Sequence, residues 1–145
     1  MRSMNEFFRS LIFYTGLFPL TILFSFISIF ILPLSRSRRY KIICGWARST
    51  LWWLKITNNL KWEVEGLEKI PNQNGIIMCK HQSAWETIAL QLIFPKQSQV
   101  LKKELFLIPF FGWALASLNP IAINRQAGVT SIKKIQKEAK KRIED

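Results

Sequence analysis

The chain has 145 residues, enough for one modest domain, and its formal net charge of +12 comes from 21 Lys and Arg against 9 Asp and Glu. This excess of positive charge favours a polyanionic partner: nucleic acid, an anionic membrane surface or a phosphorylated substrate. A content of 49% hydrophobic residues, with 6 Trp and 11 Phe, is more typical of a membrane interface. Because the sequence also has no helix-turn-helix, RNP-like or finger pattern, we expect no nucleic-acid partner.

The two cysteines, Cys44 and Cys79, argue against a disulfide framework and against a structural zinc site. They are far apart in the sequence, and no CxxC or similar metal-ligand spacing is present. We therefore expect neither a metal ion nor an organic cofactor.

Residues 10–35 contain no charged side chain. The stretch exceeds the roughly 20 apolar residues that cross a bilayer, and it is too long for the apolar region of a signal peptide, about 7–15 residues. No small-x-small cleavage pattern precedes Arg36, so we interpret the segment as retained in the membrane. Pro19 and Pro33 each remove a backbone donor, which leaves two forms open: one tilted span, or a bent segment within one leaflet.

A basic cluster follows this apolar stretch directly, whereas the other flank has only Arg2 and Arg9, with Glu6 between them. By the positive-inside rule, the asymmetry places the C-terminal side of the stretch in the cytoplasm. The cluster comprises Arg36, Arg38, Arg39 and Lys41.

Residues 41–57 are predicted to form a second helix that lies at the level of the lipid headgroups. Lys41, Arg48 and Lys55 recur every seven residues and share one helical face. The neighbouring face is apolar and carries two tryptophans, a combination that suits an interfacial helix. A soluble core helix with one solvated face is the alternative. The apolar face contains Ile42, Trp46, Trp53 and Ile56.

Beyond Asn59, short strand-like and helical segments alternate, which is typical of an α/β domain. We therefore predict an N-terminal membrane helix or helix pair in residues 1–57, followed by the first part of an α/β sheet domain in residues 58–145. The predicted strands are residues 61–66, 75–80, 99–102 and 120–124, and the predicted helices are residues 83–94, a stretch containing Pro109 and Gly112, and residues 129–143.

His81, the only histidine, follows the predicted strand at residues 75–80, and open α/β sheets place their functional sites at such strand ends. An imidazole titrates near neutral pH, which suits a general base. Glu86 follows five positions later, and on one continuous helix the two side chains would point about 140° apart. Ser83 and Glu86 match a Ser-x-x-Glu capping box, so we expect the helix to begin after Ser83. Glu86 can then orient His81 as the acid does in hydrolase triads, or it can serve only the cap.

This arrangement resembles the glycerolipid acyltransferase family, in which a membrane anchor precedes a strand that ends in a His-x4-Asp motif. Glu86 stands in place of the aspartate, which keeps the charge and adds a methylene group. Two further blocks resemble the family in order and spacing, over roughly residues 60–130, and KHQSAWET at residues 80–87 is most similar to bacterial members. The two blocks are Lys103-Glu104-Leu105 with Ile108-Pro109-Phe110-Phe111-Gly112-Trp113, and Ile121-Ala122-Ile123-Asn124-Arg125.

The resemblance implies transfer of an acyl group from acyl carrier protein or acyl coenzyme A to the 2-hydroxyl of lysophosphatidic acid, which gives phosphatidic acid. His81 would be the catalytic base, Glu86 its orienting acid, and Arg125 the ligand of the substrate phosphate. Lys103 and Gly112 would make further contacts from the second block. The implied location is the cytoplasmic (inner) membrane of a bacterium, with the catalytic part on the anionic cytoplasmic surface.

The family's third block, a Glu-Gly-Thr-Arg loop that helps bind the substrate phosphate, is expected after the last predicted helix and is not found before Asp145. The sequence therefore resembles a C-terminally truncated fragment. Two alternatives stay open: another acyltransferase of the superfamily, acting on lipid A or on glycerol 3-phosphate, and an inactive basic protein of the membrane surface.

Overall fold

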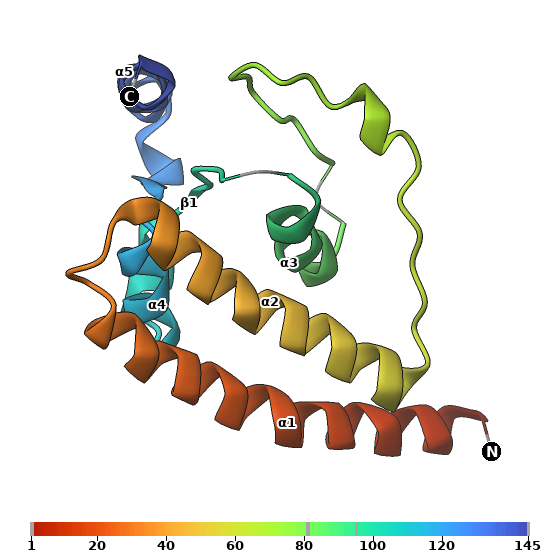
Figure 1. Ribbon diagram of the computed structural model, residues 1–145. Helices are drawn as coiled ribbons and strands as arrows, with labels where there is room; N and C mark the ends of the chain where they lie inside the picture. The colour runs from red at the N-terminus through yellow and green to blue at the C-terminus, as the bar shows by residue number, and fades with distance from the viewer. Residues whose placement is uncertain (1, 81, 95, 145) are drawn as a thin grey trace.

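The first two helices of the computed structural model, α1 (Arg2–Phe30) and α2 (Arg36–Asn58), form an antiparallel hairpin. The structure describes residues 2–80, 82–94 and 96–144. Figure 1 shows α2 running back along almost the whole of α1, with the other elements on the far side of α2 and at the closed end of the hairpin. The helix predicted for residues 41–57 is confirmed and begins five residues earlier, at Arg36.

Small and polar residues of α1 make the contact with α2. A Cβ atom added to Gly16 would lie 2.2 Å from the Trp53 ring nitrogen, so this position has no room for a larger side chain. The Trp53 indole N–H donates to the Phe13 carbonyl at 3.1 Å, and the Trp46 indole N–H donates to the Thr21 hydroxyl at 3.1 Å. Ser25 is fully buried in the same contact region. Close approach through small residues is typical of helices that pack within or on a membrane.

The outer side of α1 exposes large apolar side chains. Phe18 is 63% exposed and Phe30 is 80% exposed, so this helix buries its small residues and presents its largest ones. Within the described residues, one helix is long and apolar enough to cross a membrane, Met4–Phe30, with a mean hydropathy of 1.9. The exposed residues of this side include Phe7, Phe8, Leu11, Ile12, Tyr14, Phe18, Ile22, Leu23, Ile29 and Phe30.

Helix α3 (Ala84–Ile93) packs against the face of α2 that turns away from α1. Ala47 of α2 and Ala89 of α3 have no exposed surface, which fits a close crossing of two helices through alanines. The helix predicted for residues 83–94 is therefore confirmed almost to the residue.

A β-α-β unit follows α3. Strand β1 (Val100–Lys102) leads through the 3-10 turn η2 (Lys103–Leu107) and α4 (Phe111–Ser117) to the parallel strand β2 (Ile121–Ile123). Leu101 pairs with Ala122, and Lys102 pairs with Ile123. The strands predicted at residues 99–102 and 120–124 are confirmed, and so is a mixed fold with helices and parallel strands.

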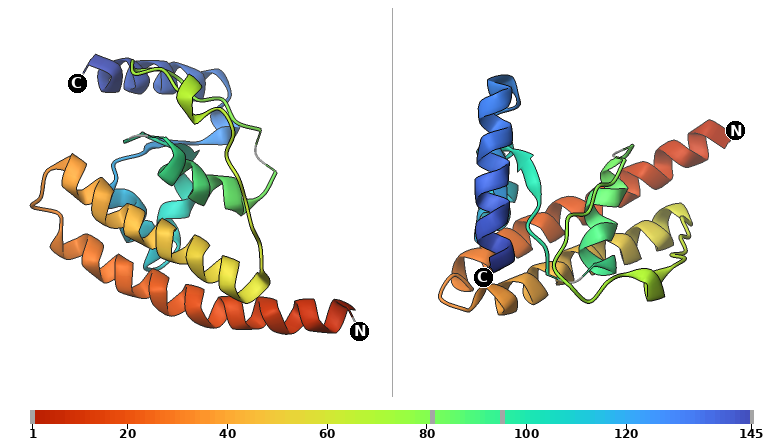
Figure 2. Two further views of the ribbon diagram at one scale, coloured as in Figure 1. Left: turned by 45° about the vertical axis from the view of Figure 1, so that its right-hand side comes forward. Right: turned by 90° about the horizontal axis from the view of Figure 1, so that it is seen from above.

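Helix α4 joins this unit to the hairpin through aromatic contacts. The ring of Phe110 lies 6.0 Å from that of Phe26, and the ring of Phe111 lies 6.1 Å from that of Trp46. The chain then passes through η3 (Arg125–Ala127) into the basic helix α5 (Val129–Glu144), which stands apart from the hairpin in the left view of Figure 2.

The strands predicted at residues 61–66 and 75–80 are wrong. Apart from the 3-10 turn η1 (Leu67–Lys69), this region is an extended loop without ladder hydrogen bonds, and Figure 1 shows it arching from the end of α2 toward α5. The second segment is not buried either, because Ile76 is 77% exposed and Met78 is 93% exposed. Alternation and apolar content favour a strand, but a strand also needs a neighbouring strand to pair with. In the part of the chain that the structure describes, the sheet contains only β1 and β2, which pair with each other, so residues 61–66 and 75–80 have no partner in it.

Candidate active site

The predicted capping box forms the start of α3. The Ser83 hydroxyl oxygen accepts a hydrogen bond from the Trp85 backbone N–H at 3.1 Å, and the Ser83 backbone N–H donates to Glu86 Oε2 at 2.8 Å. These bonds satisfy backbone donors that otherwise have no partner in the first turn of a helix. They begin the helix at Ala84 and bring Glu86 back toward the residues that precede it.

The Glu86 carboxylate is held from several directions. The Gln82 backbone N–H donates to Oε1 at 2.9 Å, and the Ser83 hydroxyl donates to Oε2 at 2.9 Å. These bonds stabilise the ionised form, and they lower the pKa of Glu86 from 4.5 to about 2, with the Gln82 N–H as the largest cause. Glu86 is therefore a fixed negative charge at neutral pH, in the first turn of α3.

His81 lies outside the described residues, so its predicted contact with Glu86 stays a prediction. Its neighbour Gln82 is described, and the Gln82 backbone is tied to the Glu86 carboxylate. Glu86 thus lies at the corner that follows His81 in the chain, as the capping box predicts. Glu86 has a demonstrated capping role, and this role does not exclude a second one, since a carboxylate has about four lone-pair positions for donors.

Lys103 and Arg125 both follow strands of the parallel sheet. Because Lys102 pairs with Ile123 in parallel register, the residues after these two strands leave the sheet at the same edge. Lys103 is exposed there, and Arg125 begins η3, where the Asn124 side-chain oxygen accepts a hydrogen bond from the Gln126 N–H at 3.1 Å. The backbone at Arg125 is described, whereas its side chain is not. The carboxyl edge of a parallel sheet is a common place for ligand binding in open α/β folds.

Gly112 has a packing role. A Cβ atom added to Gly112 would lie 2.3 Å from the carbonyl oxygen of Phe106, which belongs to the backbone of η2. Gly112 is buried at the start of α4, where the chain folds closely against this turn. The close approach explains why glycine is needed, and a contact between Gly112 and a substrate stays a prediction.

Side chains that the sequence analysis did not single out hold the other end of α3. The Gln97 amide donates to the Leu90 carbonyl at 2.7 Å, and the Gln99 amide donates to the Thr87 carbonyl at 3.3 Å. The Tyr40 hydroxyl of α2 donates to the Gln91 carbonyl at 3.4 Å. Burial raises the pKa of Tyr40 to about 12, so this hydroxyl keeps its proton and remains a donor. A glutamine shortly after a helix indicates only weakly that its side-chain amide will bind a carbonyl of that helix, because the tertiary structure determines which carbonyls it can reach.

Among the residues that the structure describes, no three His, Cys, Asp or Glu side chains gather closely enough to hold a metal ion.

Comparisons with known proteins identify the family of the chain. Residues 61–144 match the family model described as Acyltransferase. The chain is 41% identical over 132 residues to a 1-acyl-sn-glycerol-3-phosphate acyltransferase of Pseudomonas aeruginosa, a match that covers 90% of this chain and 51% of the relative. The chain thus spans about half the length of this curated relative, and no solved structure matches it. Because the family model covers more than half of the chain, including Glu86 and the β-α-β unit, this protein belongs to the acyltransferase family.

Proposed function

We propose that this protein transfers an acyl group from a thioester donor to the 2-hydroxyl of 1-acyl-sn-glycerol-3-phosphate. The name of the Pseudomonas aeruginosa relative supports this acceptor. The observation that carries the proposal is the ionised Glu86 carboxylate, fixed at the start of α3 next to the segment that contains His81. A fixed carboxylate beside an imidazole is the arrangement that prepares a histidine to accept a proton.

In the proposed reaction, His81 removes the proton of the acceptor hydroxyl as its oxygen attacks the thioester carbonyl carbon. Glu86 orients the imidazole and stabilises the imidazolium that forms. When the tetrahedral intermediate collapses, the carbon–sulfur bond breaks, and the imidazolium returns the proton to the leaving thiolate. The acceptor supplies the nucleophile, so no acyl-enzyme intermediate is required. The carrier of the acyl group is acyl carrier protein or coenzyme A.

Arg125 is the proposed ligand of the acceptor phosphate. A guanidinium group is always charged and can donate two parallel hydrogen bonds to a phosphate. The position of Arg125 immediately after β2, at the same sheet edge as the exposed Lys103, supports a cationic site there. Lys103 would add a second positive charge to it.

We also infer that the α1–α2 hairpin lies along the membrane surface, with the outer side of α1 in the lipid. A vertical α1 would draw the antiparallel α2 into the bilayer core, together with its exposed cations Lys41, Arg48 and Lys55. An in-plane hairpin buries the apolar side of α1 and leaves these cations at the headgroups. This arrangement favours a segment within one leaflet over a single span, although α1 is one unbroken helix with Pro19 inside it. The basic residues favour the anionic cytoplasmic leaflet of a bacterial membrane.

The decisive experiment expresses the protein from its complete coding sequence and supplies membranes with a radioactive acyl thioester and one acceptor at a time. Lysophosphatidic acid should be converted to phosphatidic acid. If only glycerol 3-phosphate or a lipid A precursor is acylated, the protein has another activity of the superfamily. This alternative is included because residue 86 is a glutamate and not the aspartate of the family motif. No transfer to any of these acceptors would favour a non-catalytic membrane protein.

A further inference from the structure

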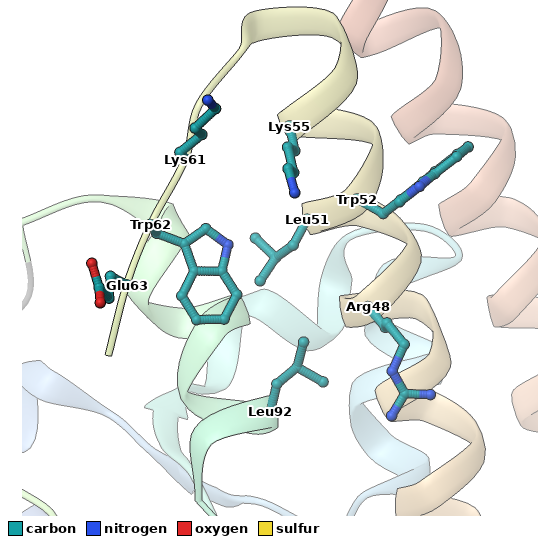
Figure 3. Close-up of a pocket in the computed structure, with 8 residues that line it drawn as sticks. All are labelled: Arg48, Leu51, Trp52, Lys55, Lys61, Trp62, Glu63 and Leu92. Atoms are coloured by element: carbon teal, nitrogen blue, oxygen red, sulfur yellow. The ribbon is translucent and has the colours of Figure 1, made fainter. Parts of the chain in front are cut away.

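A cavity of about 650 Å³ lies between α2, the chain at residues 61–63 and the end of α3. Leu51 of α2 and Leu92 of α3 form its base, and the Trp62 ring forms a side wall (Figure 3). Leu51 is 4% exposed, whereas Trp62 is 40% exposed, so the cavity is closed at its base and open at its wall. Its lining residues come from α2, residues 61–63 and α3 and do not include Lys103.

The charged side chains around this cavity are mostly cationic. Arg48, Lys55 and Lys61 line it together with a single acidic residue, Glu63. Figure 3 shows the Lys55 ammonium group pointing toward the space between Trp62 and Leu51, whereas the Glu63 carboxylate is turned away from that space. The cavity therefore combines an apolar base with a positive rim.

The surroundings of the cavity place it at a lipid interface. Trp52, which also lines the cavity, is 61% exposed, and Ile56 on the next turn of α2 is 55% exposed. Exposed tryptophans beside lysines are typical of the headgroup region of a membrane. The same helix packs its other side against α1, whose outer residues are apolar.

We propose that this cavity binds the headgroup of an anionic membrane phospholipid. Its phosphate accepts a hydrogen bond from Lys55, Arg48 adds positive charge at the rim, and the glycerol and first methylene groups lie on Leu51, Leu92 and Trp62. A free phosphate ion uses the cations but leaves the apolar base in contact with water, which is why a lipid is the better occupant. This proposal rests on the membrane position of the hairpin and is independent of acyl transfer.

The bound lipid would act on the first turn of α3 through a pair of aromatic rings. Trp62 contacts Trp85 edge to face, with ring centroids 5.6 Å apart, and Trp85 is the residue before Glu86. A lipid that contacts Trp62 would therefore fix the position of Trp85 and of the first turn of α3, which contains Glu86. Binding of a lipid in the cavity would thus fix the position of the candidate active site relative to the membrane surface.

The test compares Lys55→Gln with Lys41→Gln, a matched control that removes the same charge from an exposed position of the same helix, outside the cavity. The protein from its complete coding sequence is mixed with phosphatidylcholine vesicles containing phosphatidylglycerol, and bound protein is measured by flotation. Removal of either positive charge should lower the affinity for anionic vesicles about fivefold, because both charges are attracted to the membrane surface. We expect Lys55→Gln to lower this affinity about tenfold more than Lys41→Gln. Equal losses for the two variants would overturn the site.

A second measurement identifies the source of the phosphate. Vesicles whose phosphatidylglycerol carries brominated acyl chains should quench tryptophan fluorescence, and Trp62→Phe should remove a distinct part of that quenching. Unchanged quenching in Trp62→Phe would show that lipid does not enter the cavity. If inorganic phosphate without vesicles produces the same Lys55-dependent fluorescence change, the cavity is a free phosphate site and the lipid assignment is wrong.

Discussion

Glu86 takes part in the capping box, and it is also the residue proposed to orient His81. Its carboxylate accepts hydrogen bonds from the Gln82 and Ser83 backbones, and these bonds orient it whether or not it also contacts His81. A carboxylate that is already fixed loses little conformational freedom when it orients an imidazole, so the cap prepares the site. The two roles can be separated by measuring stability and activity on the same variants.

Glu86→Gln should lower the free energy of unfolding at pH 7, because the lowered pKa of Glu86 means that its ionised form stabilises the fold. This contribution is complete above about pH 4.5 and is lost as pH falls toward 2, so the difference from the wild type should shrink over that interval. Denaturant titration at several pH values measures it. Glu65→Gln, in the extended loop, is the control and should show little difference at any pH. A difference that does not depend on pH would contradict the capping role of the charge.

His81→Ala should reduce acyl transfer at least about a hundredfold, which is the smallest usual contribution of a general base. Membrane binding should be unchanged, since the proposed lipid contact is made by the exposed apolar side chains of α1 and not by position 81. Initial rates and flotation on the same preparation measure both quantities. Gln82→Ala is a suitable control, because it keeps the backbone N–H that Glu86 accepts. Near-normal turnover by His81→Ala would exclude this histidine as the base.

Arg125→Gln should mainly raise the KM for the phosphorylated acceptor, by about tenfold or more, because a charge-assisted hydrogen bond to phosphate is lost. The value of kcat should change less, since Arg125 is not proposed to touch the reacting atoms. Lys134→Gln on the exposed side of α5 removes an equal charge and should leave KM unaltered. If both variants raise KM equally, the effect is one of general charge, and Arg125 is not a specific ligand.

At the scale of elements, helices were predictable and half of the strands were not. The beginning of α3 follows from Ser83 and Glu86, which are three residues apart, so the information is local. Residues 75–80 have the composition of a buried strand, yet they lie in an exposed loop, because strand formation depends on partners that are distant in the sequence. The strands predicted at residues 99–102 and 120–124 are confirmed because the connection through α4 places them side by side, where they pair.

Gly112→Ala tests the contact between α4 and η2. Alanine normally favours a helix over glycine by about 1 kcal/mol, but here its Cβ would meet the Phe106 carbonyl, so we expect a net loss of roughly 1–3 kcal/mol. Thermal unfolding in detergent measures the change. Gly75→Ala is the control, since a Cβ there would have no neighbour within 4 Å. A stabilised Gly112→Ala protein would contradict the close approach of α4 to the Phe106 carbonyl.

At the scale of the whole molecule, the hairpin forms a platform for the remaining elements. α3 packs on α2, and α4 packs on α1, so the candidate active corner and the β-α-β unit are both held at a defined place relative to the hairpin. In the proposed membrane position of the hairpin, a lipid acceptor would approach the corner from the membrane surface. The positive charge of the chain favours the same surface.

Phe18→Lys should weaken membrane binding about tenfold or more, because it replaces an exposed ring on the outer side of α1 by a charge at a position proposed to lie in lipid. Flotation with vesicles of mixed phosphatidylcholine and phosphatidylglycerol measures the partition. Met78→Lys makes a similar change at a side chain that is 93% exposed on the extended loop, and it should not weaken binding. Equal binding by both variants and the wild type would place the outer side of α1 in water.

The sequence by itself determined what depends on neighbouring residues: the long apolar segment, the basic cluster after it, the cap at Ser83 and the helical period of α2 and α5. Only the tertiary structure decided what depends on distant ones. It selected β1 and β2 as the paired strands, turned the small side of α1 toward α2, and formed an open cavity between α2, residues 61–63 and α3. The physical reason is that a cap or an amphipathic face is complete within a few residues, whereas a strand, a helix crossing or a cavity exists only when segments far apart in the chain are brought together.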